Sequence, residues 1–165
     1  MPATYEPIAS QTLVSATADI FFTSIPQTYT DLVLVMTGGC TINAGVGHRF
    51  NGVNTSIYGV TYLEGNGTSA TSTRVASDTY MRVGSVPTWS TTLVNNLITH
   101  FQNYSNTSTF KTVITRINDL SNGALGLSAG CFRSTAAITS INVMTSNGTT
   151  YLVGSTFSLY GIKAE

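Results

Sequence analysis

One string in this sequence matches a catalytic motif: Gly126-Leu127-Ser128-Ala129-Gly130 has the G-x-S-x-G pattern of the nucleophile elbow of serine hydrolases. An elbow needs a strand before the serine, a helix after it, and an acid and a histidine further along the chain. After Ser128 the only carboxylate side chain is that of Glu165, no histidine follows, and Cys131–Thr135 does not begin a helix. We therefore expect a strand of small residues that passes close to another backbone, and no catalytic residue.

The side chains that bind metals or transfer protons are scattered along the chain. His48 and His100 are more than fifty residues apart, and neither has a Cys, His, Asp or Glu at metal-ligand spacing beside it. There is no Asp-rich calcium loop and no carboxylate pair close in sequence, so only the fold could bring two acids together. We expect structural histidines, no metal and no cofactor. The seven acidic residues are Glu6, Asp19, Asp31, Glu64, Asp78, Asp119 and Glu165.

Three other features carry weaker signals. Gly45–Phe50 has two glycines but lacks the third glycine of a dinucleotide loop and leads into a polar turn, so we expect no phosphate binding there. Trp89 follows Pro87 in a loop, where it either packs inside the protein or serves as an exposed anchor for a partner. Cys40 and Cys131 either form one disulfide or, as isolated cysteines in a reducing compartment commonly do, stay as two small buried thiols.

Composition excludes several classes of function. The chain has 165 residues, no net charge and 8% charged residues, against roughly 25% in an ordinary soluble domain. Without a cationic face we expect no binding to nucleic acid and none to an anionic membrane. The longest apolar stretch, Leu32–Met36, is too short to span a bilayer, and Met1–Pro7 is no secretory signal, so we expect synthesis in a cytosol. Without export we expect none of the five sequons to be glycosylated; they begin at Asn54, Asn66, Asn103, Asn106 and Asn147.

The elements that must position these residues are strands, because apolar residues recur with a period of two almost everywhere. The run Leu93–Phe101 also has helical spacing, but its Asn and Thr residues are weak helix formers and favour a strand. The predicted strands are Gln11–Ala16, Asp19–Ser24, Asp31–Gly38, Gly45–Phe50, Tyr58–Glu64, Thr79–Val86, Leu93–Tyr104, Thr109–Asn118, Ala124–Phe132, Ser140–Thr145 and Tyr151–Ile162.

Turn signals separate these strands. Asn-Gly, which accepts the positive φ of a type I′ turn, occurs at Asn51-Gly52, Asn66-Gly67, Asn122-Gly123 and Asn147-Gly148. We expect the last of these to close a β-hairpin, since predicted strands flank it on both sides. The stretch Gly65–Thr73, of low complexity, predicts one long flexible loop.

Short strands that recur every 8 to 15 residues predict an all-β fold, an antiparallel two-sheet sandwich of the jelly-roll type, as one domain over residues 1–165. Thr, Ser and Asn make up about a third of the chain, whereas Lys and Pro, which protect sheet edges, are few. Long uncharged strands without such protection favour self-association, so we expect a homo-oligomer or a docked position on a larger assembly.

Several strings resemble one family, the small structural proteins of tailed bacteriophages, and the resemblance extends from about Tyr5 to Lys163. None of these strings carries a catalytic residue, so the resemblance implies a virion component without an active site. The strings are Ser24–Leu34, Arg49–Gly52, Asn103–Thr107, Arg133–Ile138 and Gly154–Lys163.

Two roles are known in that family. Capsid decoration, or cement, proteins are small β-rich modules, often trimers, that dock on the major capsid protein and tie the shell together. Tail-fibre and spike tips are also β-rich trimers, but they recognise a host glycan or protein. The first predicted strand begins within about ten residues of Met1, which leaves no tail-attachment segment in this sequence. We therefore expect decoration of the head first, a receptor-binding role second, and a polysaccharide depolymerase, which would need two carboxylates in a groove, last.

Overall fold

A computed structural model describes residues 4–84, 89–91, 95–119 and 123–163, and every regular element in this part of the chain is a β-strand. This part of the chain therefore contains no helix long and apolar enough to cross a membrane. The strands are β1 (Tyr5–Thr12), β2 (Asp19–Phe22), β3 (Asp31–Gly38), β4 (Val46–Phe50), β5 (Tyr58–Gly65), β6 (Ala70–Asp78), β7 (Met81–Arg82), β8 (Asn95–Gln102), β9 (Lys111–Asp119), β10 (Ala124–Phe132), β11 (Ile141–Thr145) and β12 (Thr156–Ile162).

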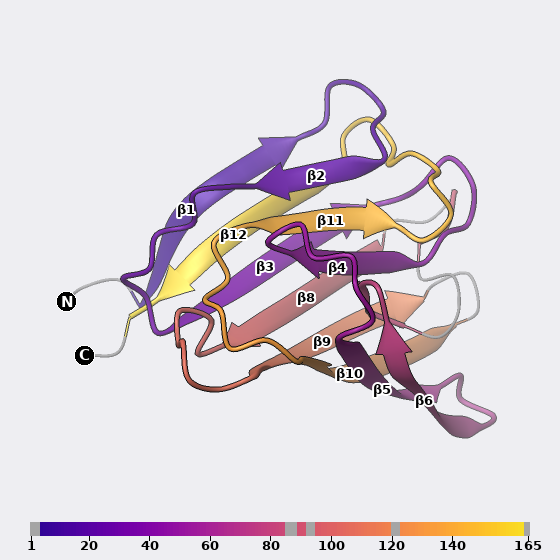
Figure 1. The fold of residues 1–165 in the computed structure, drawn as a ribbon. Helices are drawn as coiled ribbons and strands as arrows, with labels where there is room; N and C mark the ends of the chain where they lie inside the picture. Colours follow the sequence, from indigo (N-terminus) through magenta and orange to yellow (C-terminus); the bar gives the residue numbers. More distant parts are fainter. Residues whose placement is uncertain (1–3, 85–88, 92–94, 120–122, 164–165) are drawn as a thin grey trace.

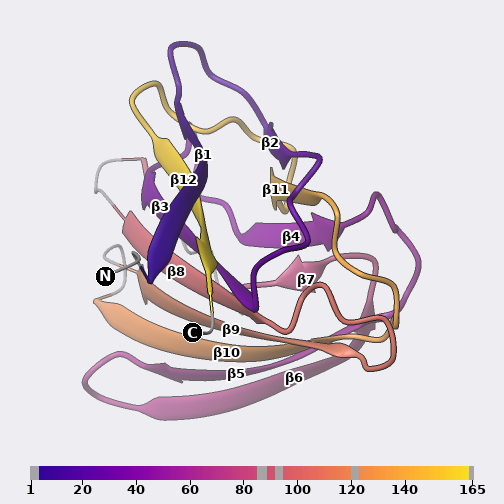
Figure 2. The same ribbon diagram turned by 90° about the vertical axis from the view of Figure 1, so that its left-hand side faces the viewer.

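The strands form two antiparallel sheets that pack as a sandwich. The larger sheet has eight strands in the order β1-β12-β3-β8-β9-β10-β5-β6, and the smaller has four in the order β2-β11-β4-β7. The larger sheet curves around the smaller one, with β5 and β6 at one end of the curve (Figures 1 and 2). The predicted all-β antiparallel sandwich is confirmed.

The jelly roll is visible once two hairpins are set aside. Without β5–β6 and β9–β10, the other eight strands, renumbered along the chain, form sheets in the orders 1-8-3-6 and 2-7-4-5, which is the jelly-roll arrangement. The two hairpins add to the free side of β8, so that β9, β10, β5 and β6 extend the larger sheet. We call these four the added strands and the other eight the jelly-roll strands.

The positions of the hairpins correct one prediction. Asn147-Gly148 does form a turn, with Gly148 at φ 70°, but β11 before it and β12 after it belong to different sheets, so it closes no hairpin. The hairpins β5–β6 and β9–β10 turn instead at Gly67 (φ 82°) and Gly123 (φ 62°), in two of the other Asn-Gly pairs. The sequence marks where the chain turns, whereas the sheet to which each strand belongs decides what the turn connects.

A second correction concerns the stretch 65–73, which is not a flexible loop. Only residues 66–69 form the turn, and β6 begins at Ala70 and pairs with β5. The alternating pattern is missing because almost every β6 side chain is exposed, as on an edge strand with little to cover it. The first strand also differs: β1 runs over Tyr5–Thr12 instead of Gln11–Ala16, since an edge strand tolerates Pro7.

Other boundaries move by smaller amounts. Between residues 93 and 101 the described part, from Asn95 onward, is the strand β8, which excludes a helix there; Leu93 and Val94 lie outside the described residues. The predicted strand Thr79–Val86 is reduced to β7, with Ser85 and Val86 outside the described residues. Strand β12 begins at Thr156 instead of Tyr151, because Gly154 at φ 86° interrupts it.

The core lies between the two sheets and is rich in aromatic rings. Phe50 of β4 contacts the rings of Tyr58, Phe101 and Phe132 at centroid distances of 5.2 to 5.8 Å. At the other end of the sandwich, Trp89 stacks on Phe157 and meets Tyr151 edge-on. Trp89 is only 1% exposed, so it packs inside the protein and is not an exposed anchor.

Candidate functional site

Ser128 lies in the middle of β10, which continues through Phe132 with no helix after it. Its side chain faces the interior and is 3% exposed. The flanking glycines leave room for side chains of neighbouring strands: a Cβ on Gly126 would lie 2.8 Å from Ile117, and one on Gly130 2.4 Å from the sulfur of Met81. The expected strand of small residues is confirmed, but its close neighbours are side chains and not another backbone.

His48 connects the two sheets through a buried chain of hydrogen bonds. Its Nε2 lies 3.0 Å from Thr99 Oγ1 on β8, which lies 3.0 Å from Thr115 Oγ1 on β9. All three side chains are at most 1% exposed. Burial lowers the pKa of His48 to about 3, because the apolar surroundings disfavour the charged imidazole. His48 is therefore a neutral core residue that no substrate reaches.

His100 forms a separate polar contact near the surface. Its Nε2 lies 3.0 Å from Asp31 Oδ2, and the other carboxylate oxygen of Asp31 accepts a hydrogen bond from the backbone N–H of Asn103 at 2.7 Å. Asn103 has a positive φ of 49°, so this contact holds the turn that follows β8. Both histidines have structural partners, as expected from the sequence.

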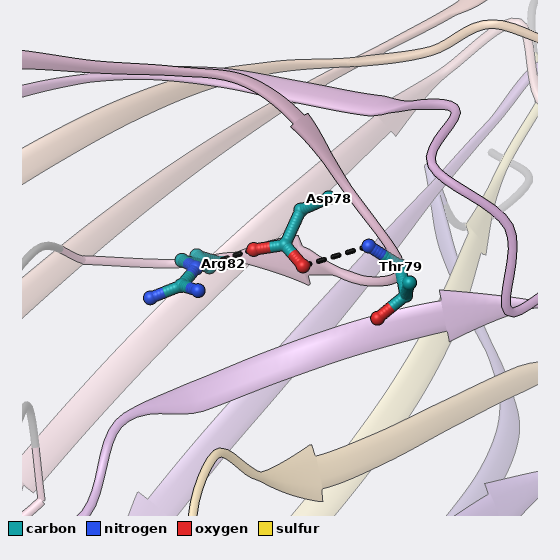
Figure 3. Close-up of polar contacts among 3 residues, drawn as sticks. All are labelled: Asp78, Thr79 and Arg82. Atoms are coloured by element: carbon teal, nitrogen blue, oxygen red, sulfur yellow. Dashed lines mark hydrogen bonds and ion pairs between the residues drawn. The ribbon is translucent and has the colours of Figure 1, made fainter.

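Tyr62, on the inner face of β5, lies near a cluster of charged and aromatic side chains around β7. Arg82 Nε donates to Asp78 Oδ2 at 2.5 Å, and Asp78 Oδ1 accepts from the backbone N–H of Thr79 at 2.7 Å (Figure 3). The Arg82 guanidinium also lies 5.3 Å from the centre of the Tyr80 ring. The hydroxyl of Tyr62 is buried without a hydrogen-bond partner. Burial raises the pKa of Tyr62 well above its usual value, so this phenol cannot act as a base at neutral pH.

Other charged residues have separate partners. Lys163 Nζ donates to Glu6 at 2.9 Å, Asn142 donates to Asp19 at 3.0 Å, and the buried Lys111 donates to two backbone carbonyls. Among the described residues, no three His, Cys, Asp or Glu side chains lie together as metal ligands would. These charged groups therefore hold loops and strand ends in place and do not converge on one site.

The two cysteines are free thiols. Cys40 is in the core, where burial raises its pKa to about 12, so it is an inert, protonated thiol. Cys131 is half-buried and faces outward from β10. The pairing that the sequence left open is therefore absent from this structure.

The outer face of the added strands carries an exposed apolar cluster that the sequence reasoning missed. Leu127 of β10 lies directly opposite Leu63 of β5, and Leu125 lies opposite Gly65. Their exposed fractions are 41%, 54% and 70% for Leu127, Leu63 and Leu125. The signal was in the sequence, since leucines alternate with small residues between positions 124 and 130, but only the structure shows that the leucines face outward. We call these three residues the leucine patch.

A shallow trough of about 330 Å³ lies on the same outer face, beside the leucine patch. Small residues such as Gly59, Thr61 and Ala129 line it together with Arg74 and Arg133. Arg133 is held by hydrogen bonds to the carbonyls of Ala76 and Ser56, whereas Arg74 is exposed and has no hydrogen-bond or ion-pair partner within the described residues. The outer face of the added strands thus combines exposed apolar side chains with an arginine that has no partner in the part of the chain that the structure describes.

The class that the fold and this surface define is an all-β, two-sheet jelly-roll sandwich with an exposed apolar patch on its outer face. Comparison with known proteins adds no family to this description, since no family model and no curated protein matches the chain. Among solved structures, the marine PL-14 alginate lyase from Aplysia kurodai is similar to it at 10% sequence identity and a TM-score of 0.31, covering 87% of this chain and 80% of that protein. A likeness of this size carries no argument about activity.

Proposed function

We propose that this protein is a non-catalytic structural component of a tailed-phage virion, a capsid decoration protein that docks on the outer shell and stabilises the head. The observation that carries this proposal is the leucine patch, Leu63, Leu125 and Leu127, exposed on the outer face of the added strands. Exposed apolar side chains that cluster on one face mark an interaction surface. The major capsid protein is the partner that the resemblance to phage structural proteins implies.

The state of the reactive-looking residues supports a role without catalysis. Ser128 and His48 are buried, and each packs or bonds within the sandwich. Tyr62 is protonated at neutral pH and buried beneath the polar cluster around β7. A catalytic group must reach its substrate in the correct protonation state, and none of these three side chains does.

Low charge predicts how the docking responds to salt. The leucine patch is apolar, and among the side chains of β5, β6, β9 and β10 whose burial the structure describes, the exposed charged ones are Arg74 and Arg116. Apolar burial and neutral hydrogen bonds depend little on ionic strength, whereas binding through ion pairs weakens steeply with salt. We therefore expect particles to retain the protein in high salt.

A receptor-binding role at a tail tip, with a host glycan as ligand, is the second candidate. The trough beside Arg74 and Arg133 favours it, because small side chains and a free guanidinium suit a polar, anionic group. In this case the protein would be present in a few dozen copies at most, whereas a decoration protein is present in hundreds.

The decisive experiment measures binding to heads stripped of the protein. We expect the double variant Leu63→Thr, Leu127→Thr to lose binding, because threonine keeps the strand but removes most of the apolar contact. Val14→Thr, at a side chain 90% exposed and away from the added strands, is the matched control and should bind normally. Stripped heads should also rupture at a lower temperature than complete ones.

Two results would overturn the decoration hypothesis. One is normal head binding by the Leu63→Thr, Leu127→Thr variant. The other is a location on the tail alone, seen by labelled-antibody microscopy, with a copy number far below that of the major capsid protein; this result would favour the receptor-binding role.

A further inference from the structure

The two edges of the eight-stranded sheet are protected to different degrees. At the edge strand β1, Pro7 has no backbone N–H to offer, a register shift between Pro7 and Ala9 interrupts the ladder, and Glu6 is paired with Lys163. Proline, bulges and charged side chains are the devices by which sheets avoid adding a further strand. The β1 edge is therefore a poor template for another chain.

The opposite edge, β6, lacks these devices along most of its length. It has nine residues, seven of them exposed, and it contains neither proline nor lysine. Its register with β5 shifts only between Tyr58 and Val60, so the pairing from Ala70 to Val75 is regular. Arg74 is the only charged residue in that regular part. This edge leaves a regular row of backbone donors and acceptors open to another strand.

We propose that a second copy of this chain pairs with this edge, β6 against β6, antiparallel across a two-fold axis. A two-fold interface uses the same patch on both copies, and because Arg74 is the one charge in the regular part of β6, repulsion between the copies is avoided by a register that keeps the two Arg74 side chains apart. The inference does not depend on the proposed function, because it concerns the isolated protein.

The faces of the strand limit the register of this pairing. Directly opposite residues of an antiparallel pair lie on the same face, so Arg74 can face only Ala70, Ser72, Ala76 or its own symmetry mate. Like charges directly opposite each other are destabilising, which disfavours Arg74 against Arg74. With Thr73 on the axis, Arg74 faces Ser72 and Val75 faces Thr71. In this register the two β6 strands still pair along most of their regular part. Thr73 opposite Thr73 is itself a favourable cross-strand pair.

The proposed dimer has a consequence for the surface described above. A two-fold axis perpendicular to the joined sheet places the outer faces of both copies on the same side, so the two leucine patches face the same way. A β6–β6 contact also closes at two copies. It therefore predicts a dimer, or an assembly built of dimers, instead of the trimer that the phage resemblance implies.

The test uses the purified full chain and needs no phage particle. Light scattering after size-exclusion chromatography should give twice the 17.5 kDa of one chain. Thr73→Lys places two lysines together at the axis and should weaken the dimer by about tenfold or more. Thr12→Lys, the same change at an exposed position of β1, the opposite edge strand of the same sheet, is the matched control and should leave the dimer intact. Circular dichroism confirms that both variants are folded.

Cysteine cross-linking tests the register independently. Thr73→Cys should form a disulfide with its symmetry mate under mild oxidation, because the axis brings the two residues face to face. Thr71→Cys, which faces Val75, and the unaltered chain should not cross-link. A monomeric chain, a mass of three copies, a dimer indifferent to Thr73→Lys, or cross-linking by Thr71→Cys instead of Thr73→Cys would each overturn the proposal as stated.

Discussion

The core of the jelly roll and the outer face of the added strands use apolar side chains in opposite ways. In the jelly roll, Phe50, Phe101 and Phe157 are fully buried between the two sheets. In the added strands, β9 and β10 bury their inner faces, for example with Phe132, but the outer face leaves Leu125 70% exposed. Apolar burial between the sheets stabilises the fold, whereas apolar exposure on the added strands contributes little to it and is the basis of the proposed docking surface.

This difference shows how one sheet can serve two purposes. Each added hairpin leaves the jelly roll and returns to it, so its strands extend the sheet without changing the order of the other eight. The inner faces of β9 and β10 pack into the core, and this packing holds the β9–β10 hairpin in place. Their outer faces and the edge β6 are then free of any packing requirement.

The strongest test of the comparison is the removal of a central ring. Phe50→Ala leaves a cavity among Tyr58, Phe101 and Phe132 and should lower the free energy of unfolding by about 3–5 kcal/mol. Urea unfolding followed by tryptophan fluorescence measures this loss. A loss under about 1 kcal/mol would mean that this end of the sandwich is not the stabilising core.

Sequence reasoning recovered the strands that bury apolar residues better than the connections between strands. The predicted bounds of Asp31–Gly38 and Ala124–Phe132 are those of β3 and β10. Strand β3 has consecutive buried residues, as an apolar run covered on both faces does, and β10 alternates between a covered and an exposed face. Strand β6 was missed because a strand exposed on both sides has no such alternation. The exposed leucine patch was missed because alternation does not tell which of two faces is covered.

The functional-site predictions succeeded where a motif has partners at fixed places along the chain and failed where the contact joins distant strands. The missing histidine and acid downstream of Ser128 correctly argued against an elbow, since that motif needs fixed partners in chain order. The buried contact between His48, Thr99 and Thr115 joins residues from three strands and two sheets, and no local pattern reports such a contact. Pairing across sheets depends on the fold as a whole.

Two glycines, one near each end of the larger sheet, differ in how tightly they are packed. A Cβ on Gly161 of β12 would lie 2.3 Å from the ring of Tyr29, so Gly161→Ala should destabilise the protein by about 1–3 kcal/mol. Gly65 of β5 has its nearest neighbour at 3.8 Å, and Gly65→Ala should be neutral or slightly stabilising. Urea denaturation of both variants checks this contrast; equal losses would show that Gly65 is packed as tightly as Gly161.

The buried histidine predicts a pH dependence that originates where the two regions meet. His48 has a pKa of about 3 in the folded protein and about 6.5 when unfolded. Below pH 6.5 the unfolded chain binds a proton that the folded chain does not, so stability falls as the pH decreases from about 6.5 toward 3. We expect a loss of about 1 kcal/mol between pH 7 and pH 5.5.

The control for this effect replaces each histidine in turn. His48→Gln should remove the slope between pH 7 and pH 5.5, while His100→Gln, at the half-buried contact with Asp31, should retain it. Chemical unfolding at several pH values provides the measurement. An unchanged slope in His48→Gln would mean that another group titrates in this range.

The smallest effect on stability should come from the leucine patch. Leu125 is 70% exposed, and the residue opposite it on β5 is Gly65, which has no side chain to contact it. Leu125→Thr therefore removes little buried area and should change the free energy of unfolding by less than about 0.5 kcal/mol. The same change should raise solubility, because it reduces the apolar surface through which molecules associate. Unfolding curves and the protein concentration at precipitation measure the two effects separately. If Leu125→Thr destabilised the chain as much as Gly161→Ala does, the outer face of the added strands would be part of the packed structure, and the leucines would not be free to contact a partner.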